Sequence, residues 1–283
     1  MTVKVGTSKF VEINGQKSHY LDWGSAQETI LLIHGDMRTS RSFDAVSRRL
    51  SKRFRVIALD LFGHGDSHWP KSGYRFKDRS ENILKFIEEA HIGNITAVAH
   101  STGAVALTLC AAEHTSLFKK LVLLEPMLKV DESFQKMVST QGSRPRTTWA
   151  SREELAELLN THKVTRNWTE EVISDVVAHE TFINPSGRLD MKWAPPTRQW
   201  QDREHDYLDL IAYLKQLSKP TLFVVSSEGR HDFSEAFHLE KETPNFFCST
   251  VRDSGHNMYM ERPDAISQLI TAFCSGVSMP AEI

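Results

Sequence analysis

A serine lies within a run of small residues near the middle of the chain. Residues 99–103 read Ala-His-Ser-Thr-Gly and connect an apolar, β-prone run at 95–99 with an Ala-rich helical stretch at 104–112. A strand that turns so tightly into a helix needs small neighbours, because the two backbones nearly touch, and the turn exposes the central side chain. Ser101 is therefore a candidate nucleophile, and the N–H of Thr102 at the helix start is placed to stabilise an anion.

A serine nucleophile needs a base to accept its proton. Among the 13 histidines, His256 follows the last expected strand, beside a glycine and just before the closing helix. Loops at the carboxyl ends of strands converge on one edge of an open α/β sheet, so we expect Ser101 and His256 to meet there. We interpret His34 and His100 as structural residues.

The elements that must position these side chains alternate along the chain. Apolar strands are expected at 29–34, 55–60, 95–99, 121–124, 221–226 and 246–251, with helices between them and an Asn14-Gly15 hairpin before them. Continuous apolar strands that alternate with helices indicate an α/β fold, with a mostly parallel central sheet flanked by helices.

The alternation stops between residues 127 and 213. This stretch holds polar, helix-prone pieces at 131–140, 151–160 and 169–180, and four of the six tryptophans. We therefore expect a core formed by residues 1–126 and 214–283, with a helical cap at 127–213 over one edge of the sheet.

Composition excludes several function classes. The chain has 283 residues, 34 basic and 36 acidic, so no charge excess favours nucleic acid or an anionic membrane. The three cysteines lie far apart, without metal-ligand spacing, and no apolar run is long enough to span a membrane. We expect a cytoplasmic protein that acts on a small-molecule substrate. We expect no cofactor, no metal, and neither a nucleic-acid nor a membrane partner. The oligomeric state stays open.

These motifs, in this order, resemble the α/β-hydrolase superfamily over nearly the whole chain. The motifs that carry the resemblance are His34-Gly35 for the oxyanion loop, residues 60–67 for the turn after the fourth strand, residues 99–103 for the nucleophile elbow and residues 254–256 for the histidine loop. The resemblance implies the α/β-hydrolase fold, Ser101 as nucleophile, His256 as base, and an oxyanion hole formed by the N–H groups of Asp36 and Thr102.

The acid that would orient His256 departs from the commonest pattern of that superfamily. Most members place an Asp after the seventh strand, where this chain has Gly229. Some members take the acid from the end of the sixth strand, where Glu125 lies. We prefer Glu125 to Asp232, with Glu228 third; the other interpretation of Glu125 is an ion pair with a basic side chain.

Asp36 is an unusual residue for an oxyanion loop. An ionised carboxylate that faces a developing negative charge is unfavourable. The side chain therefore either turns away to cap its own loop or contacts a donor group of the substrate.

The expected cap carries arginines and tryptophans that could select a substrate. Guanidinium groups bind carboxylates and aromatic faces bind planar rings, so we predict Arg146, Trp149 and Trp200 as substrate-binding residues. The alternative interpretation is that most of these arginines form solvated salt bridges with nearby acids.

The leading hypothesis is a serine hydrolase that cleaves an ester, lactone, thioester or amide of a small acyl compound, including carboxylated or aromatic ones. The chain is similar to 2-(acetamidomethylene)succinate hydrolases and, less closely, to cofactor-free 2,4-dioxygenases, which carry Trp in place of Asp36 and His in place of Thr102. A second hypothesis is a dioxygenase or lyase with His256 as general base. A third is a ligand-binding member without catalysis.

Overall fold

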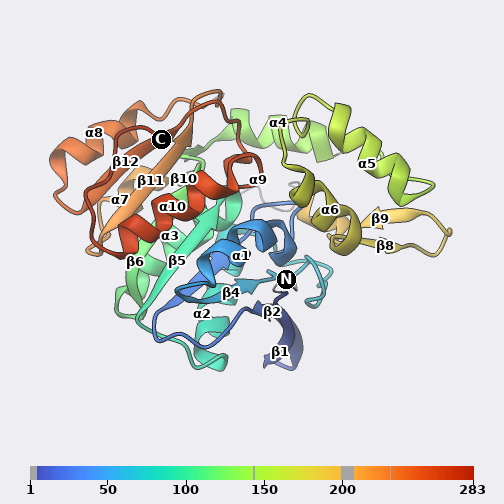
Figure 1. The fold of residues 1–283 in the computed structure, drawn as a ribbon, viewed down its shortest axis with the longest axis horizontal. Coiled ribbons are helices and arrows are strands. Elements are labelled where there is room, and N and C mark those ends of the chain that lie inside the picture. The colour runs from blue at the N-terminus through green and yellow to red at the C-terminus, as the bar shows by residue number, and fades with distance from the viewer. Residues whose placement is uncertain (1–4, 143, 199–206, 230) are drawn as a thin grey trace.

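An eight-stranded sheet forms the centre of the computed structural model, which describes residues 5–142, 144–198, 207–229 and 231–283 (Figure 1). The strand order is β1 (Thr7–Ile13), β2 (Gln16–Asp22), β4 (Arg55–Leu59), β3 (Thr29–Ile33), β5 (Ile95–His100), β6 (Phe118–Leu124), β11 (Thr221–Ser226) and β12 (Phe246–Val251). The β1–β2 and β2–β4 pairs are antiparallel, and every pair from β4 to β12 is parallel. The predicted mostly parallel sheet is confirmed.

The β1–β2 hairpin is closed by the two residues that the sequence predicts. Asn14 and Gly15 have φ angles of 51° and 75°, the left-handed conformation that a two-residue hairpin turn requires. The turn pairs Ile13 with Gln16, and the antiparallel register continues to Thr7 and Asp22.

Helices cover both faces of the sheet, because alternate strand side chains point to opposite sides. On β3, Leu31 and Ile33 join one apolar cluster, whereas Ile30 and Leu32 join another. The first cluster includes residues of α2 (Phe76–Glu89), α3 (Ser101–Glu113), α7 (Leu210–Leu214) and α8 (Ser234–Glu242). The second includes residues of α1 (Asp44–Leu50), α9 (Met258–Glu261) and α10 (Pro263–Cys274). The core is thus a three-layer α/β/α arrangement.

The segment from 127 to 213 contains the three expected helices and four strands that were not expected. The helices are α4 (Glu132–Gly142), α5 (Arg152–Thr161) and α6 (Glu170–His179), which group with the β8–β9 hairpin at one end of the molecule (Figure 1). The strands pair as β7 (Lys129–Val130) with β10 (Leu208–Asp209) and β8 (Thr181–Ile183) with β9 (Leu189–Met191). Strands of two or three residues are too short to give a periodic signal in the sequence.

Backbone hydrogen bonds attach this segment to the turn after β4 and to the end of α9. The N–H of Gly65 donates to the carbonyl of Lys192 at 2.8 Å, and the N–H of Ala194 donates to Gly63 at 2.7 Å. Thr169 donates to the carbonyl of Met260 at 3.2 Å. Within the described ranges, no helix combines the length and apolarity needed to cross a bilayer.

Candidate active site

Ser101 lies at the corner where β5 ends and α3 begins. Its φ angle is 51°, a left-handed conformation that is costly for a residue with a side chain and that is concentrated at functional sites. A Cβ atom on Gly103 would lie 2.2 Å from the carbonyl oxygen of His34, and one on Gly35 would lie 3.0 Å from the Cβ of Ser101. The corner and the loop after β3 can approach this closely only because both positions are glycine.

His256 reaches Ser101 from the loop between β12 and α9. The Ser101 hydroxyl and His256 Nε2 are 3.1 Å apart, and the His256 side chain is 39 % exposed. The loop is held by His100, whose Nε2–H donates to the His256 carbonyl at 2.8 Å, and by Glu261, which accepts from the N–H of Gly255 at 3.0 Å. Burial keeps the pKa of His100 well below its usual range, so this imidazole is neutral. Its structural role stays a prediction.

Glu125 contacts the other nitrogen of the same imidazole. It follows β6 with a φ angle of 43°, and its Oε2 accepts from His256 Nδ1–H at 2.7 Å. Oε1 accepts from the N–H of Ser226 at 2.7 Å and from the Ser226 hydroxyl. Burial raises the pKa of Glu125, but the His256 and Ser226 hydrogen bonds outweigh it, so the net pKa is lowered and the carboxylate is ionised. A hydroxyl, an imidazole and a carboxylate therefore form one connected chain.

Among the described contacts, neither of the other two candidate acids pairs with His256, whose carboxylate partner is Glu125. Asp232 is exposed and accepts from the N–H of Ser234, the first residue of α8, at 2.9 Å, and this contact lowers its pKa. Glu228 is also exposed, and its backbone N–H donates to Ser254 at 3.0 Å. A Cβ atom on Gly229 would lie 2.8 Å from Glu125 Oε1. The Glu125 carboxylate therefore occupies the space next to residue 229, where most members of the superfamily have their aspartate.

The Asp36 side chain pairs with a basic residue, a contact that was not expected from the sequence; its contact with a substrate donor stays a prediction. Its Oδ1 lies 2.6 Å from Nη2 of Arg79, and Arg79 Nη1 donates to the Thr102 hydroxyl at 3.1 Å. The sequence analysis missed Arg79. Its signal was a charged residue on the apolar face of an amphipathic helix, four residues before Ile83 and seven before Phe86, both buried.

His34 stabilises its own loop, as predicted. Its Nδ1–H donates to the carbonyl of Gly35 at 2.7 Å, and its Nε2 accepts from the N–H of Leu61 at 3.1 Å. Burial lowers the pKa of His34, so the ring is neutral, in the tautomer that both contacts require.

The residues predicted to bind substrate have other partners or cannot be placed. The Arg146 guanidinium bonds to Asp190 at 2.6 Å and to the carbonyls of Trp193 and Met191, and it lies 3.8 Å from the centroid of the Trp193 ring. Trp149 is buried, and its backbone pairs with Leu189 in both directions at 2.9 Å. Trp200 lies outside the described residues. A role of Arg146 and Trp149 in substrate binding stays a prediction.

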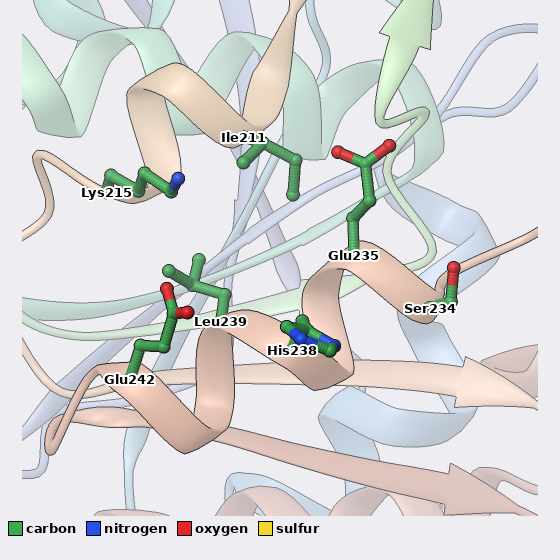
Figure 2. A pocket seen from close by; sticks show the side chains of 7 residues that line it. All are labelled: Ile211, Lys215, Ser234, Glu235, His238, Leu239 and Glu242. Carbon is green, nitrogen blue, oxygen red and sulfur yellow. The ribbon is translucent and has the colours of Figure 1, made fainter.

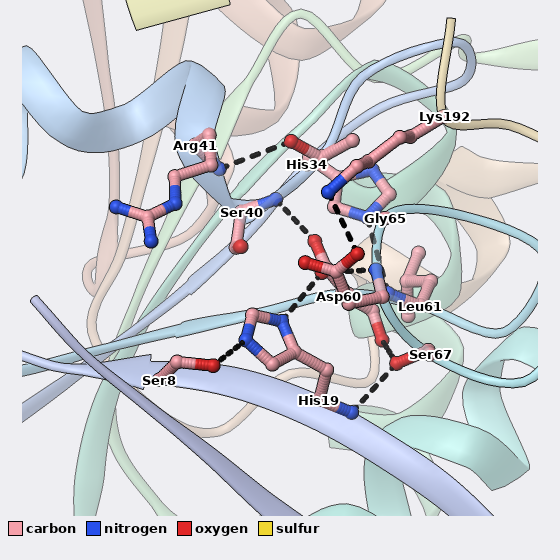
Figure 3. A network of polar contacts seen from close by, with 12 residues as sticks. Ser8, His19, His34, Ser40, Arg41, Asp60, Leu61, Gly65, Ser67 and Lys192 are labelled. Atoms are coloured by element: carbon pink, nitrogen blue, oxygen red, sulfur yellow. Dashed lines mark hydrogen bonds and ion pairs between the residues drawn. The ribbon is translucent and has the colours of Figure 1, made fainter. Parts of the chain in front are cut away.

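Two groups of side chains in the described ranges bring together residues of the types that bind metal ions. The first group is His19, Asp60 and Asp66, and the second is Asp44, Asp175 and His179. In the first group, Asp60 accepts from His19 Nδ1–H at 2.7 Å and from the N–H groups of Ser40 and Asp66 at 2.6 and 3.0 Å (Figure 3). Burial raises the pKa of Asp60, but these donors lower it to about 2. In the second group, Arg41 and Arg48 already pair with the two aspartates. Both groups therefore have a structural explanation.

A shallow pocket of about 260 Å³ lies between α7 and α8 (Figure 2). Its lining includes Lys215, Glu235, His238 and Glu242 around the apolar Ile211 and Leu239. No residue of the Ser101 site lines it, so it offers no place for chemistry at that serine.

The chain is similar in sequence to known proteins. The model of the alpha/beta hydrolase family matches residues 30–269. The uncharacterized hydrolase YugF of Bacillus subtilis is 25% identical over 271 residues, which cover 92% of this chain and 94% of the relative. The 2-(acetamidomethylene)succinate hydrolase of Mesorhizobium japonicum is 34% identical over 96 residues, which is 34% of each chain.

Solved structures show the same fold. The crystal structure of E-2-(acetamidomethylene)succinate hydrolase superposes with a TM-score of 0.84, and the match covers 95% of this chain and 99% of that one. The sequence identity is 21%, so this likeness concerns the fold alone. Because the family model matches most of the chain, the chain belongs to the alpha/beta hydrolase family.

Proposed function

We propose that this chain is a serine hydrolase that cleaves an ester, lactone, thioester or amide of a small acyl compound through an acyl-enzyme on Ser101. The observation that carries the proposal is the connected chain of contacts. Ser101 Oγ lies 3.1 Å from His256 Nε2, and His256 Nδ1 lies 2.7 Å from Glu125 Oε2. A nucleophile, a base and an orienting acid in this geometry can perform acyl transfer.

In the proposed reaction, His256 Nε2 takes the hydroxyl proton as Ser101 Oγ bonds to the substrate carbonyl carbon. The carbonyl π electrons move to the oxygen, and the oxyanion lies at the N–H groups of Thr102 and Asp36. Removing one such donor typically costs about 3 kcal/mol of transition-state stabilisation. The bond to the leaving group then breaks as His256 returns the proton to it. A water molecule, deprotonated by His256, hydrolyses the acyl-enzyme in the same way.

Glu125 acts through the imidazole in this mechanism. An ionised carboxylate on Nδ1–H holds His256 in the tautomer whose Nε2 accepts a proton, and it stabilises the imidazolium that forms. The hydrogen bonds from Ser226 support this role, because they keep the carboxylate charged although it is buried.

We also propose that residues 127–213 serve as a cap that shapes the pocket over a core of residues 1–126 and 214–283. The attachments of this segment to the turn after β4 and to the end of α9 support that role. The substrate is a small molecule and the reaction needs no cofactor. The relative named as a 2-(acetamidomethylene)succinate hydrolase makes carboxylated amides a class to test beside simple esters. The cytoplasmic location stays a prediction from the sequence.

The test is hydrolysis of p-nitrophenyl acetate together with labelling by a fluorophosphonate. The wild-type chain should release p-nitrophenol and should carry the label on Ser101, and Ser101→Ala should lose both. A panel of longer esters, lactones, thioesters and carboxylated amides then ranks the substrate classes by kcat/KM. Equal hydrolysis by the wild type and Ser101→Ala would contradict the proposal. Substrate-dependent O₂ uptake with a hydroxyquinolone, without labelling, would favour the dioxygenase hypothesis instead.

A further inference from the structure

Arg79 is a buried cation beside the two residues that supply the proposed oxyanion hole. Its side chain is 4% exposed, and it comes from α2, an element that carries no other residue of the candidate site. A buried guanidinium is costly unless its donors are satisfied and its charge is balanced. The partners of Arg79 therefore show what the fold uses it for.

The three guanidinium nitrogens of Arg79 contact three different elements. Nε donates to the carbonyl of Tyr74 at 3.2 Å, in the loop before α2. Nη1 donates to the Thr102 hydroxyl at 3.1 Å, at the start of α3. Nη2 forms an ion pair at 2.6 Å with Asp36 Oδ1, in the loop after β3, although the two groups are not aligned as a hydrogen bond. Because the guanidinium is planar and rigid, these contacts fix the spacing between residues 36 and 102.

The same contact balances a charge at the site. The Asp36 side chain is 18% exposed, and its backbone N–H is one of the two proposed oxyanion donors. His64 also faces this carboxylate, at 3.9 Å. Burial keeps the pKa of His64 well below its usual range, so His64 supplies no positive charge at neutral pH. His34, whose ring is tilted against that of His64 with 4.8 Å between the centroids, is neutral for the same reason. Of the two described residues that face the Asp36 carboxylate, Arg79 is therefore the one that carries a positive charge at neutral pH.

We propose that Arg79 is a positioning residue for the oxyanion hole: its ion pair with Asp36 and its hydrogen bond to Thr102 hold the two backbone donors at a fixed spacing and cancel a negative charge beside the developing oxyanion. This inference rests on the proposed serine hydrolase function. It predicts that Arg79 acts on the transition state more than on substrate binding, because the oxyanion forms only as the bond to Ser101 forms.

The experiment measures kcat and KM for p-nitrophenyl acetate, the rate of fluorophosphonate labelling and the thermal midpoint of each variant. Arg79→Gln should lower kcat about 100-fold, the size expected for a disturbed oxyanion donor, and should leave KM within about threefold. Arg79→Lys should recover only part of the loss, because an ammonium cannot form the planar fork. Arg55→Gln is the matched control: Arg55 pairs with Asp22 at 2.9 Å, far along the sheet, and its loss should leave kcat within about twofold.

The proposal that Arg79 cancels the charge of Asp36 is tested by comparing the single variant Arg79→Gln with the double variant Asp36→Asn/Arg79→Gln. The kcat of the double variant should be at least about tenfold higher than that of Arg79→Gln, because the uncompensated negative charge of Asp36 is gone. The second substitution should also restore folding, should the single variant be unstable. A double variant no more active than Arg79→Gln, or an Arg79→Gln as active as Arg55→Gln, would overturn the inference. A wild type no more active than Ser101→Ala would instead refute the hydrolase function, and this inference with it.

Discussion

Two buried glutamates of this protein have pKa values shifted in opposite directions. Glu125, after β6, is 1% exposed, and Glu180, directly after α6, is 0% exposed. The pKa of Glu125 is lowered, whereas burial raises the pKa of Glu180 to about 7, even though Arg38 and Thr39 act to lower it. Both side chains are almost inaccessible to solvent, so exposure alone does not explain why the two shifts have opposite directions.

The difference lies in the donors that reach each carboxylate. Glu125 accepts two hydrogen bonds from Ser226 and one from His256. Glu180 faces Arg38 at 3.2 Å, but neither of its oxygens makes a well-aligned hydrogen bond to another described residue. A buried carboxylate stays ionised only where several aligned donors replace the water it has lost. The candidate site therefore keeps a fixed charge, whereas the contact between α6 and the loop after β3 can titrate.

The largest expected effect separates the two glutamates by activity. Glu125→Gln should lower kcat on p-nitrophenyl acetate by about 10⁴-fold, because the neutral amide no longer selects the His256 tautomer or stabilises the imidazolium. Glu180→Gln should keep kcat within about threefold. Asp232→Asn should also keep kcat within about threefold, because the Asp232 carboxylate is exposed and contacts Ser234. This variant is the control for the alternative acid. Near wild-type turnover of Glu125→Gln, with a large loss in Asp232→Asn, would move the acid to residue 232.

A smaller effect concerns the glycine that leaves room for Glu125. Gly229→Ala should lower kcat about tenfold or more, since its Cβ would lie 2.8 Å from Glu125 Oε1 and displace the carboxylate. Glu125→Gly removes that obstacle, so Glu125→Gly/Gly229→Asp should be at least about tenfold more active than Glu125→Gly alone. The coupling between the two positions is calculated from the kcat values of Glu125→Gly, Gly229→Asp and the double variant. Strictly additive losses would mean that the two positions do not share one space.

The smallest effect is a difference in stability between Glu180→Gln and the wild type that changes with pH. The folded pKa of Glu180 is raised, so its ionisation destabilises the fold progressively from about pH 4.5, where the unfolded group titrates, up to about 7. Relative to the wild type, Glu180→Gln should therefore gain about 1 kcal/mol of unfolding free energy per pH unit between 6 and 7, and nothing further above pH 8.

The measurement is urea unfolding of both chains between pH 5.5 and 8.5. Taking the difference cancels the opposite contribution of buried His34, His64 and His100, whose lowered pKa values make the fold less stable as the pH falls below their unfolded values. Asp232→Asn is the reference: the lowered pKa of Asp232 places its pH-dependent loss of stability in acid, so the difference between this variant and the wild type should be flat in this range. A flat curve for Glu180→Gln would show that Glu180 is ionised throughout.

Sequence alone determined the architecture and the candidate nucleophile and base of this protein. The apolar strands, the hairpin at Asn14-Gly15 and the tight corner at Ser101 are local features, since strand periodicity and left-handed turns depend on neighbouring residues. The three helices of the 127–213 segment were equally visible, whereas its two- and three-residue strands were not. The structure brings Ser101, His256 and Glu125 together, and their catalytic roles stay predictions.

Only the tertiary structure decided how the charges at the site are balanced. The ion pair of Asp36 with Arg79 joins the loop after β3 to α2. The close approach of Glu125 to Gly229 joins the ends of β6 and β11. The raised pKa of Glu180 depends on how fully α6 and the loop after β3 enclose it. Each of these properties arises between residues far apart in the chain, so no local pattern of residue types encodes it, and it exists only once the segments have packed.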